Sequence, residues 1–270
     1  MQLSDSITCV AIIAVRNEAE HIHRALAAFT AAGVDVVVID NDSTDDSVDR
    51  CREFDSKGLL FMDRLPWRGY FDLSAQLKAK QKIAQKLSHD WVIHADADEW
   101  LQSPASGETL LQGIKRVSQQ GYNIINFDEF VFLPVKGDKL RGNRYEKDFL
   151  HYYYFAPARH RLMRAWRNSV EFTNVASGGH RVHGGHVKLC PENFVLRHYI
   201  ALSYEHAVRK YVGRAFSQVD LSKNWHGNRR DLTTEQLRFP TTDRLKKLGT
   251  WDSVDFDRSE PFTRHYWEWS

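Results

Sequence analysis

The first hundred residues contain four short apolar segments, which predict four buried β-strands. Uninterrupted apolar runs of this length are typical of parallel strands that helices cover on both faces. The predicted strands span Cys9–Val15, Val34–Ile39, Leu59–Met62 and Trp91–His94.

Helices are predicted between these strands because apolar residues recur there at spacings of three and four. The first opens at Asn17 and ends before Gly33, the second is capped by Ser43 or Thr44 and reaches about Lys57, and the third spans Asp72–Leu87. Such alternation of strand and helix implies a parallel sheet with helices on both faces. The predicted fold class is therefore α/β, a three-layer α/β/α sandwich with a mainly parallel central sheet.

The pattern is less regular in the second half of the chain. It predicts a helix over Gly107–Gln120, a long β-like run over Tyr122–Val135 and a helix over Ser203–Phe216. Residues 136–200 combine basic, aromatic and glycine-rich segments without a clean period. We therefore divide the chain into a core at 1–135 and an irregular α+β extension at 136–270, helical toward its end, within one compact unit.

The composition excludes several classes of protein. Hydrophobic residues make up 42% and charged residues 27% of the 270 residues, which is typical of soluble globular proteins. The 37 basic and 35 acidic side chains leave a net charge of +2, so no overall field points to a nucleic-acid partner. The sequence has no GxGxxG motif, which argues against a dinucleotide-binding Rossmann site.

The sequence also predicts a cytoplasmic protein. Its longest apolar run has seven residues, far fewer than the roughly 20 that a membrane-spanning helix needs. The start, Met1 to Asp5, lacks the basic and apolar regions of a secretory signal. Cys9, Cys51 and Cys190 are odd in number and widely spaced, as in a reduced protein without disulfides.

Asp96 and Asp98 directly follow the fourth predicted strand and are the sharpest chemical feature of the sequence. Two carboxylates this close together at a turn can bind one divalent cation, which would bridge them to phosphate oxygens. A solvated acidic turn is the plainer interpretation of such a pair. The apolar run before it and Trp100 and Leu101 after it favour a site, because they place both acids at the rim of a core.

Asp40, Asn41 and Asp42 follow the second predicted strand. Carboxylate and amide side chains suit hydrogen bonds to a nucleobase or to ribose hydroxyls, and they equally suit the capping of a helix. In parallel α/β sheets, ligands bind beyond the carboxyl ends of the strands. Since both acidic clusters lie at such ends, they predict one shared ligand site.

Histidines form two further candidate groups. His180, His183 and His186 lie among glycines at a spacing that matches neither of the common zinc motifs, so a glycine-bounded hairpin is favoured over a zinc site. His198 precedes a predicted helix that carries Lys210 and other basic residues, whose charges suit a diphosphate. A basic surface helix is an equally good interpretation.

Three segments, taken together in this order, resemble the N-terminal half of family 2 glycosyltransferases of the GT-A fold, of the bacterial type with a DxD motif. They are residues 10–19 (VAIIAVRNEA), 36–45 (VVVIDNDSTD) and 91–100 (WVIHADADEW). The resemblance covers a little over a third of the chain. It implies a Rossmann-like GT-A core at 1–135 that binds a nucleotide sugar, an acceptor-facing extension, and transfer of the sugar from a nucleotide-diphosphate donor.

The resemblance also implies roles for individual residues. Asp96 and Asp98 match the DxD motif, which holds Mn²⁺ or Mg²⁺ against the diphosphate. His198 would be a further ligand of the metal or the diphosphate, and Lys210 would stabilise the leaving diphosphate. The implied nucleoside pocket is lined by Ala14, Arg16, Glu18, Asp40, Asn41 and Asp42. Arg16 and Asn41 depart from the residues usual in the family, which leaves the nucleobase open.

Inversion, the default that the resemblance implies, needs a carboxylate base within about 3 Å of the acceptor hydroxyl. Asp128 and Glu129 interrupt the β-like run, and one of them is expected to face the cleft because successive side chains of a strand alternate. Glu129 is the first candidate for the base, ahead of Asp128 and Glu192. A carboxylate on the solvent face is an equal alternative.

The sequence thus predicts a metal-dependent glycosyltransferase with a glycan, polysaccharide or lipid-linked acceptor. Two other classes stay open, a nucleotide-sugar-binding protein without turnover and a phosphatase or phosphotransferase that uses Asp96 and Asp98. The latter is disfavoured because Glu99 and Trp100 follow the acids, where a Gly-Thr pair is typical. The aromatic tail Tyr266–Trp269 either packs against the protein or touches the inner face of a membrane peripherally.

Overall fold

The computed structural model describes residues 7–136, 138 and 144–269. Ten strands of these residues form one sheet in the order β10-β7-β6-β8-β4-β1-β2-β3, with β9 joined to β5 and β6. The neighbouring parallel strands are β1 (Cys9–Val15), β2 (Asp35–Asp40), β3 (Leu59–Arg64) and β4 (Trp91–Ala95). The predicted α/β fold is confirmed. Residues 1–5, on which part of the predicted location rests, lie outside the described residues.

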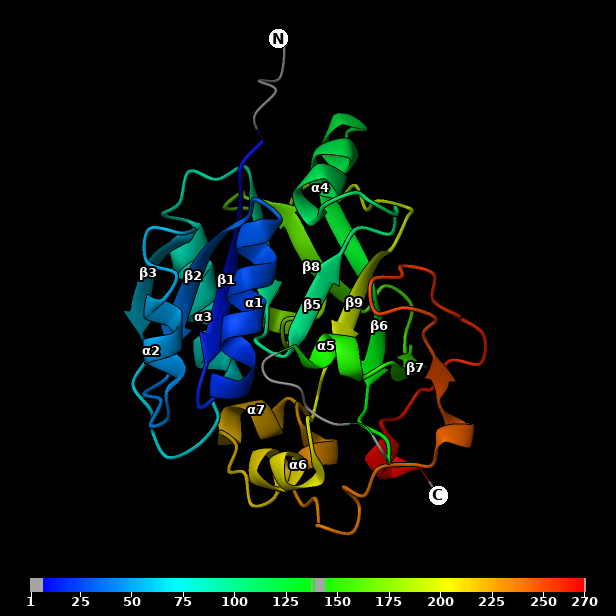
Figure 1. The fold of residues 1–270 in the computed structure, drawn as a ribbon. Coiled ribbons are helices and arrows are strands. Elements are labelled where there is room, and N and C mark those ends of the chain that lie inside the picture. Colours follow the sequence, from blue (N-terminus) through cyan, green and yellow to red (C-terminus); the bar gives the residue numbers. More distant parts are fainter. Residues whose placement is uncertain (1–6, 137, 139–143, 270) are drawn as a thin grey trace.

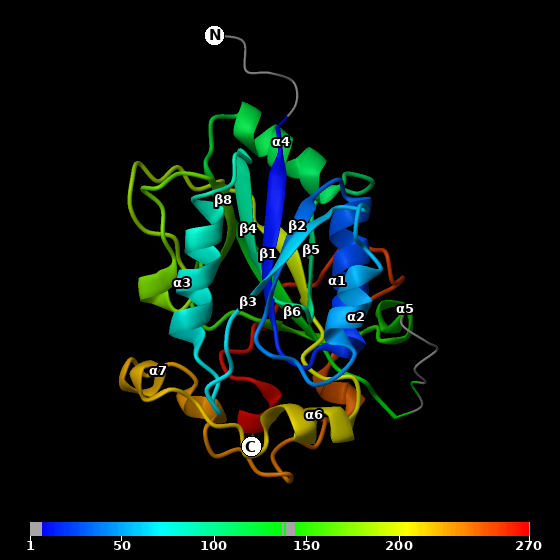
Figure 2. The ribbon, with the colours of Figure 1, turned by 90° about the vertical axis from the view of Figure 1, so that its left-hand side faces the viewer.

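Helices cover both faces of the parallel strands, as predicted (Figure 2). α1 (Ala19–Ala31) and α2 (Ser47–Arg52) lie on one face, and α3 (Leu73–Ala84) lies on the other. The side chains of β1 alternate, so that Ile13 joins the core with α1 while Ile12 joins the core with α3. Full burial of such an aliphatic side chain contributes about 1.5–3 kcal/mol, and a strand buried on both faces is therefore apolar throughout.

The second half of the chain continues the same sheet with mainly antiparallel pairing. β8 pairs with β4 and β6, β7 pairs with β6 and β10, and β9 lies parallel to β6. These elements are β5 (Glu99–Gln102), α4 (Leu110–Gln119), β6 (Ile124–Phe132), β7 (His151–Phe155), β8 (Leu162–Arg167), β9 (Phe194–His198) and β10 (Lys246–Lys247). Strands from both predicted regions share one sheet, and the boundary at residue 135 stays a prediction.

Short helices lie beyond the carboxyl ends of the parallel strands (Figures 1 and 2). They are α6 (Tyr204–Tyr211) and α7 (Gln218–Ser222). The backbone of Phe71, just before α3, bonds to Ala215 and Ser217 at 2.8 and 2.9 Å and ties this cover to the sheet. Other described helices are α5 (Tyr145–Asp148) and the 3-10 turns η1 (Val175–Ser177), η2 (Gly227–Arg229), η3 (Thr242–Arg244) and η4 (Tyr266–Glu268).

The second predicted helix is wrong at both ends. α2 begins after Asp46 and ends at Arg52, well short of the predicted end. Ser43 and Thr44 do not cap it, because they contact the loop after β1 instead. The Ser43 hydroxyl accepts a hydrogen bond from the backbone N–H of Asn17 at 3.1 Å, and the N–H of Thr44 donates to the Asn17 side chain at 2.7 Å.

The helix predicted over Ser203–Phe216 is shorter in the structure. Ser203 caps α6 as predicted, and its hydroxyl accepts a hydrogen bond from the backbone N–H of His206 at 3.1 Å. α6 nevertheless ends at Tyr211, and Gly213 then has φ of +71°, a left-handed conformation that continues no helix. Arg214 therefore lies in the segment between α6 and α7.

The cysteines and the aromatic tail pack inside the protein. Cys9, Cys51 and Cys190 are free and buried. Tyr266 and Trp267 are buried in a hydrophobic cluster, as expected for a packed tail. Among the residues described, no helix has the length and apolar character needed to cross a membrane.

Candidate active site

A cleft of about 400 Å³ opens at the carboxyl ends of β1 and β4, under the segment that includes α6. Its strand wall includes residues 96–99, Glu129, Arg164 and His198. Its cover wall consists of Lys210, Tyr211, Arg214, Asn224, Trp225, His226, Asn228 and Arg229. The predicted site residues that line the cleft are Ala14, Arg16, Glu18, Asp96, Asp98, Glu129, His198 and Lys210. Those that do not line it are Asp40, Asn41, Asp42 and Asp128.

Asp98 lies at the junction of the two walls. One of its carboxylate oxygens is 2.8 Å from Nζ of Lys210 and 3.2 Å from Nε2 of His198. Burial alone would raise the pKa of Asp98, but Lys210 and His198 outweigh it and hold this pKa well below its usual range. Asp98 is therefore ionised at neutral pH and neutralised by two cationic partners.

Asp96 is the more exposed of the two acids, with 46% of its side chain accessible. Its oxygens lie 3.4 Å from Nζ of Lys80 and 3.4 Å from a guanidinium nitrogen of Arg164. These cations overcome desolvation and hold the pKa of Asp96 below its usual range. The backbone N–H of Glu99 donates to the Asp96 carbonyl at 3.1 Å, which closes the turn that carries both acids.

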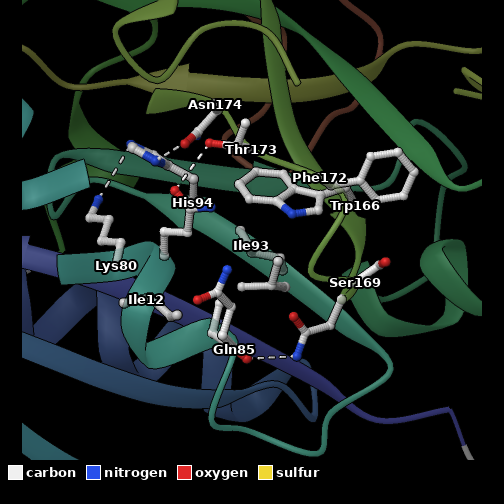
Figure 3. Close-up of a pocket in the computed structure, with 14 residues that line it drawn as sticks. Ile12, Lys80, Gln85, Ile93, His94, Trp166, Ser169, Phe172, Thr173 and Asn174 are labelled. Atoms are coloured by element: carbon white, nitrogen blue, oxygen red, sulfur yellow. Dashed lines mark hydrogen bonds between the residues drawn. The ribbon is translucent and has the colours of Figure 1, made fainter. Parts of the chain in front are cut away.

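Asp96 is backed by a chain of three polar side chains, Lys80, His94 and Asn174, which are labelled in Figure 3. Lys80 donates to the carbonyl of Ala95 at 2.8 Å and lies 3.3 Å from His94, which in turn lies 3.1 Å from Asn174. This chain borders a cavity of about 20 Å³, which is room for about one water molecule. Burial, followed by the charge of Lys80, holds the pKa of His94 well below its usual value, so the imidazole is neutral.

Lys80 is not among the site residues predicted from the sequence, and a lysine on a helix is usually solvated. In the structure Lys80 is 6% exposed. A signal was present, since Lys80 lies three residues after Leu77 and four before Ala84, on the apolar face of α3. A charged residue on such a face needs a buried partner.

Glu129 faces the cleft, as predicted for one of the two acids of β6. Its carboxylate pairs with Arg161 and accepts a hydrogen bond from Nδ1 of His198 at 2.7 Å. Arg161 and His198 overcome the effect of burial and lower the pKa of Glu129. Asp98 and Glu129 likewise overcome burial and raise the pKa of His198 well above its usual value. His198 is therefore a protonated bridge between two carboxylates.

Asp128 points away from this cleft because neighbouring side chains of a strand lie on opposite faces. Its oxygens accept hydrogen bonds from Tyr154 at 3.2 Å, Asn193 at 2.9 Å and Arg258 at 2.8 Å. Asp128 therefore holds β6, β7 and the C-terminal segment together. Glu192, the third candidate for the base, pairs with Arg116 at 2.9 Å and is not among the cleft residues.

Glu99 and Arg164 form a second buried ion pair in the strand wall, which sequence reasoning missed. Burial and the nearby charge of Asp96 raise the pKa of Glu99 to about 7, and Arg164 acts in the opposite direction. The backbone N–H of Asp96 also donates to Glu99 at 3.1 Å. The pair thus fixes the position of Asp96. Glu99 carried a weak signal, because it follows the acidic motif directly.

Arg16 lines the cleft and packs on Trp67, which is not among the lining residues. Its guanidinium lies 3.9 Å from the centre of the Trp67 ring, and it donates to the carbonyls of Asn41 (2.8 Å) and Asp42. The Asn41 amide donates to the carbonyl of Leu65 at 2.8 Å, which anchors the loop after β3. This planar guanidinium and indole surface suits stacking with a nucleobase.

Asp40 and Asp42 both accept hydrogen bonds from other groups of the protein. Asp42 accepts from Nε of Arg64 at 2.6 Å and from the backbone N–H of Trp67 at 2.8 Å. Asp40 accepts from the backbone N–H of Ser43 at 3.1 Å. These contacts hold loops in place and cap no helix, since α2 begins only after Asp46. Direct contact of either acid with a nucleoside stays a prediction.

Glu18 also lines the cleft. One of its oxygens is 3.6 Å from Nζ of Lys210, and the other is buried without a hydrogen-bond partner among the described residues. Burial raises the pKa of Glu18 to about 7, although Lys210 opposes this shift. An unpartnered buried oxygen is an acceptor that a ligand hydroxyl can satisfy.

The family of the N-terminal part follows from its sequence. Residues 10–125 match the sequence profile of the family described as Glycosyl transferase family 2. This segment belongs to glycosyl transferase family 2. It contains Arg16, Asp96 and Asp98, and it ends before Glu129 and His198, so the match has no bearing on the roles of those two residues.

Curated relatives of this family 2 segment are also named as glycosyltransferases. The chain is 31% identical over 99 residues to an uncharacterized glycosyltransferase of Rickettsia felis and 30% identical over 99 residues to one of Rickettsia conorii. Each match covers 36% of this chain and 31% of the relative. The chain thus spans about a third of the length of the relatives it matches.

Two solved structures show a more distant likeness. S. aureus TarS 1–349 in complex with UDP is 11% identical, with 86% of this chain and 69% of that chain covered and a TM-score of 0.45. Glucosyl-3-phosphoglycerate synthase from Mycobacterium tuberculosis in complex with phosphoglyceric acid is 16% identical, with 54% and 48% covered and a TM-score of 0.31. The family 2 assignment rests on the sequence match alone.

Proposed function

We propose that the protein is a glycosyltransferase that moves a sugar from a nucleotide-diphosphate donor to a hydroxyl acceptor. One observation carries the proposal: Asp96 and Asp98, inside the family 2 segment, lie at the end of β4 and line a cleft that also holds several cations. Ligands of parallel α/β sheets bind at such strand ends. The arrangement suits a polyphosphate held between carboxylate-bound and protein-borne positive charge.

The donor is proposed to lie along the cleft from Arg16 to Asp98. Its nucleobase would stack on the Arg16 and Trp67 surface, and a ribose hydroxyl would donate to the unpartnered oxygen of Glu18. Its diphosphate would then lie beside Lys210, whose ammonium lies 2.8 Å from Asp98. Lys210 is placed to stabilise the negative charge that develops as the nucleoside diphosphate leaves.

Asp96 and Asp98 fit a divalent cation that the diphosphate helps to hold. Both are ionised oxygen ligands, as Mg²⁺ and Mn²⁺ prefer, and Mg²⁺ is often bound by one or two carboxylates plus substrate phosphates. Within the described residues, no group of three possible ligand side chains could hold a metal by itself. When bound, the cation would neutralise the leaving diphosphate. His198 would first have to lose its proton to act as the predicted ligand.

Glu129 is the proposed base for an inverting transfer. It is ionised and reaches the strand wall from β6, so its carboxylate is placed to take the proton of an acceptor hydroxyl as that oxygen bonds to the sugar. Arg161 and His198 weaken its basicity, so a base role requires the acceptor to displace Arg161. The acceptor is proposed to be a glycan, polysaccharide or glycolipid.

Donor turnover tests the proposal without a known acceptor. The wild type and Asp98→Asn are incubated with uridine, guanosine, adenosine and thymidine diphosphate sugars plus Mn²⁺, and release of the nucleoside diphosphate is measured. We expect slow hydrolysis of one nucleotide series by the wild type and its loss in Asp98→Asn. Binding of a nucleotide sugar with no release would support a binding protein, and hydrolysis of a simple phosphate ester would support a phosphatase.

A further inference from the structure

Two guanidiniums of the cover wall lack carboxylate partners. Arg214 and Arg229 both line the cleft, and neither forms an ion pair with any carboxylate in the described part of the chain. Arg214 lies over the ring of Phe71, 4.2 Å from its centre. Nε of Arg229 is buried without a hydrogen-bond partner among the described residues. Both arginines are half-buried, and a half-buried guanidinium without an ion-pair partner favours an anionic ligand.

His226 also lines the cleft without a hydrogen-bond partner for its ring nitrogens among the described residues. Its ring stacks on Phe216 with 4.9 Å between centres, and both of its nitrogens are buried without partners among the residues described. Burial and the charge of Arg229 lower the pKa of His226 to about 3. Phe71 joins the two parts of this group, because its ring lies 4.2 Å from the Arg214 guanidinium and contacts the His226 ring edge-on at 5.3 Å between centres. Burial and the charge of Arg229 lower the pKa of Arg214, and Glu18 and Asp98 act in the opposite direction. An anion bound beside both guanidiniums would offset their positive charge.

Three further cations of the cleft already have carboxylate partners. These pairs are Lys210 with Asp98, Arg161 with Glu129, and Arg164 with Glu99. The donor diphosphate proposed above would be balanced by Lys210 and by a cation on the acidic pair. The positive charges of Arg214 and Arg229 are therefore not needed to balance the donor diphosphate.

Arg229 lines the same cleft as Glu129, the proposed base. Burial and nearby cations, among them Arg229, lower the pKa of His180 to about 3 and hold that of His265 well below its usual value. His180 lies 3.2 Å from Arg161, the partner of Glu129, and the charge of Glu129 also acts on His265. The charge of Arg229 is thus felt beside the proposed base.

We infer that Arg214 and Arg229 bind an oxyanion carried by the acceptor, a phosphate or a carboxylate, at a subsite separate from the donor diphosphate. The planar fork of a guanidinium matches both groups through paired hydrogen bonds. The acceptor would accordingly be a hydroxyl compound that also bears a negative charge. This inference rests on the proposed function, since it takes the cleft to hold a donor and an acceptor together.

Titration calorimetry with small anions tests the subsite. Inorganic phosphate and, separately, acetate are titrated into the protein alone and into the protein saturated with Mg²⁺ and the nucleoside diphosphate of the series it accepts. We expect at least one of the anions to bind in both states, with affinities that differ less than threefold. Tighter binding of phosphate indicates a phosphorylated acceptor, and tighter binding of acetate indicates a carboxylated one.

Matched variants assign the binding to the guanidinium pair. Arg229→Gln should weaken the anion at least tenfold, Arg229→Lys should weaken it less, and Arg209→Gln should leave it unchanged. Arg209 is the control because it lies on α6 but pairs with Glu20 at 2.7 Å, outside the cleft. Thermal unfolding of each variant confirms that it is folded.

Loss of anion binding when the nucleotide is present would overturn the inference, because the pair would then belong to the diphosphate site. Equal binding by Arg229→Gln and the wild type, or no binding of either anion, would overturn it as well. Failure of every nucleoside diphosphate to bind would contradict the proposed function instead. The titration of the nucleotide-free protein would still report on the anion subsite in that case.

Discussion

The two walls of the cleft differ in how their charges are paired. In the strand wall, Asp96, Asp98, Glu99 and Glu129 each contact at least one cation. In the cover wall, Arg214 and Arg229 have no carboxylate partner within the described ranges, and both nitrogens of His226 lack hydrogen bonds there. Charges removed from water are usually paired, and the half-buried guanidiniums of the cover wall depart from this rule.

This difference separates stability from function. A paired carboxylate loses a partner when either residue is changed, and the remaining buried charge then destabilises the fold. An unpaired cation contributes little to the fold and is available to a negatively charged ligand. The strand wall should therefore respond to substitution mainly in folding and donor use, and the cover wall mainly in ligand binding.

The largest effect is expected for Asp98→Asn. Lys210 would remain buried with Glu18 at 3.6 Å as its nearest carboxylate, which should lower the free energy of unfolding by about 3–5 kcal/mol. Donor turnover should fall by about 10²–10³-fold because charge at the leaving diphosphate is lost. Urea unfolding and nucleotide release measure the two effects. Asp35→Asn, at a half-exposed pair with His89, should change stability by less than about 1 kcal/mol.

The next largest effect is a difference in stability between two variants, each with one arginine replaced in a different wall. Arg164→Gln should destabilise the protein by about 3 kcal/mol because Glu99 loses its buried partner. Arg229→Gln should change the free energy of unfolding by less than about 0.5 kcal/mol, since it breaks no ion pair. Urea unfolding of both variants measures the difference. Equal destabilisation would contradict the contrast between the walls.

Glu129→Gln should lower kcat about 100-fold if Glu129 is the base. The same change removes one of the two carboxylates that raise the pKa of His198, so this pKa should move down toward its usual value. NMR titration of the His198 ring gives that pKa independently of turnover. An unchanged kcat with a lowered pKa would leave Glu129 as the partner of His198 and remove it as the base.

A smaller effect is expected from pH. The pKa of His180, His206 and His226 is lowered to about 3 in the folded protein, whereas an unfolded histidine has a pKa of about 6.5. The folded state therefore binds fewer protons between these values, and stability should fall as pH drops from 6.5 toward 3. Thermal unfolding at pH 7, 6, 5 and 4 measures this decline.

His226→Phe sharpens the pH test. Phenylalanine keeps the stacking on Phe216 and removes two buried unpartnered nitrogens, so this variant should lose less stability than the wild type as the pH falls. An equal decline in both proteins would assign the pH dependence to other groups.

The sequence predicted the strand wall better than the cover wall, for physical reasons. β1 and β4 are apolar throughout because helices bury both faces, so the residues that follow them could be placed at strand ends. Strand alternation predicted that one acid of β6 would face the cleft but not which one. In the register of β6 beside β9, Glu129 lies opposite Leu196 and its side chain contacts His198. This contact shows that Glu129 is the acid that faces the cleft.

The cover wall depends on contacts that no local pattern encodes. Arg229 and His226 belong to a stretch without helical or strand period, and they line the cleft from the segment that follows α7. The roles of Asp40 and Asp42 were equally open, since their partners lie in loops brought close by the fold. Burial of Lys80 could be inferred from its helical face, but its contact with Asp96 could not.

Calorimetric titration of nucleoside diphosphates, with and without Mn²⁺, into the wild type and Asp98→Asn is the most direct test of the donor site. We predict that one diphosphate binds the wild type in the presence of Mn²⁺ and binds Asp98→Asn at least tenfold more weakly. At 100 times its Kd, such a ligand should also stabilise the wild type by about 2.7 kcal/mol. Absence of binding by every nucleoside diphosphate, or equal binding by both proteins, would contradict the proposed donor site at Asp96 and Asp98.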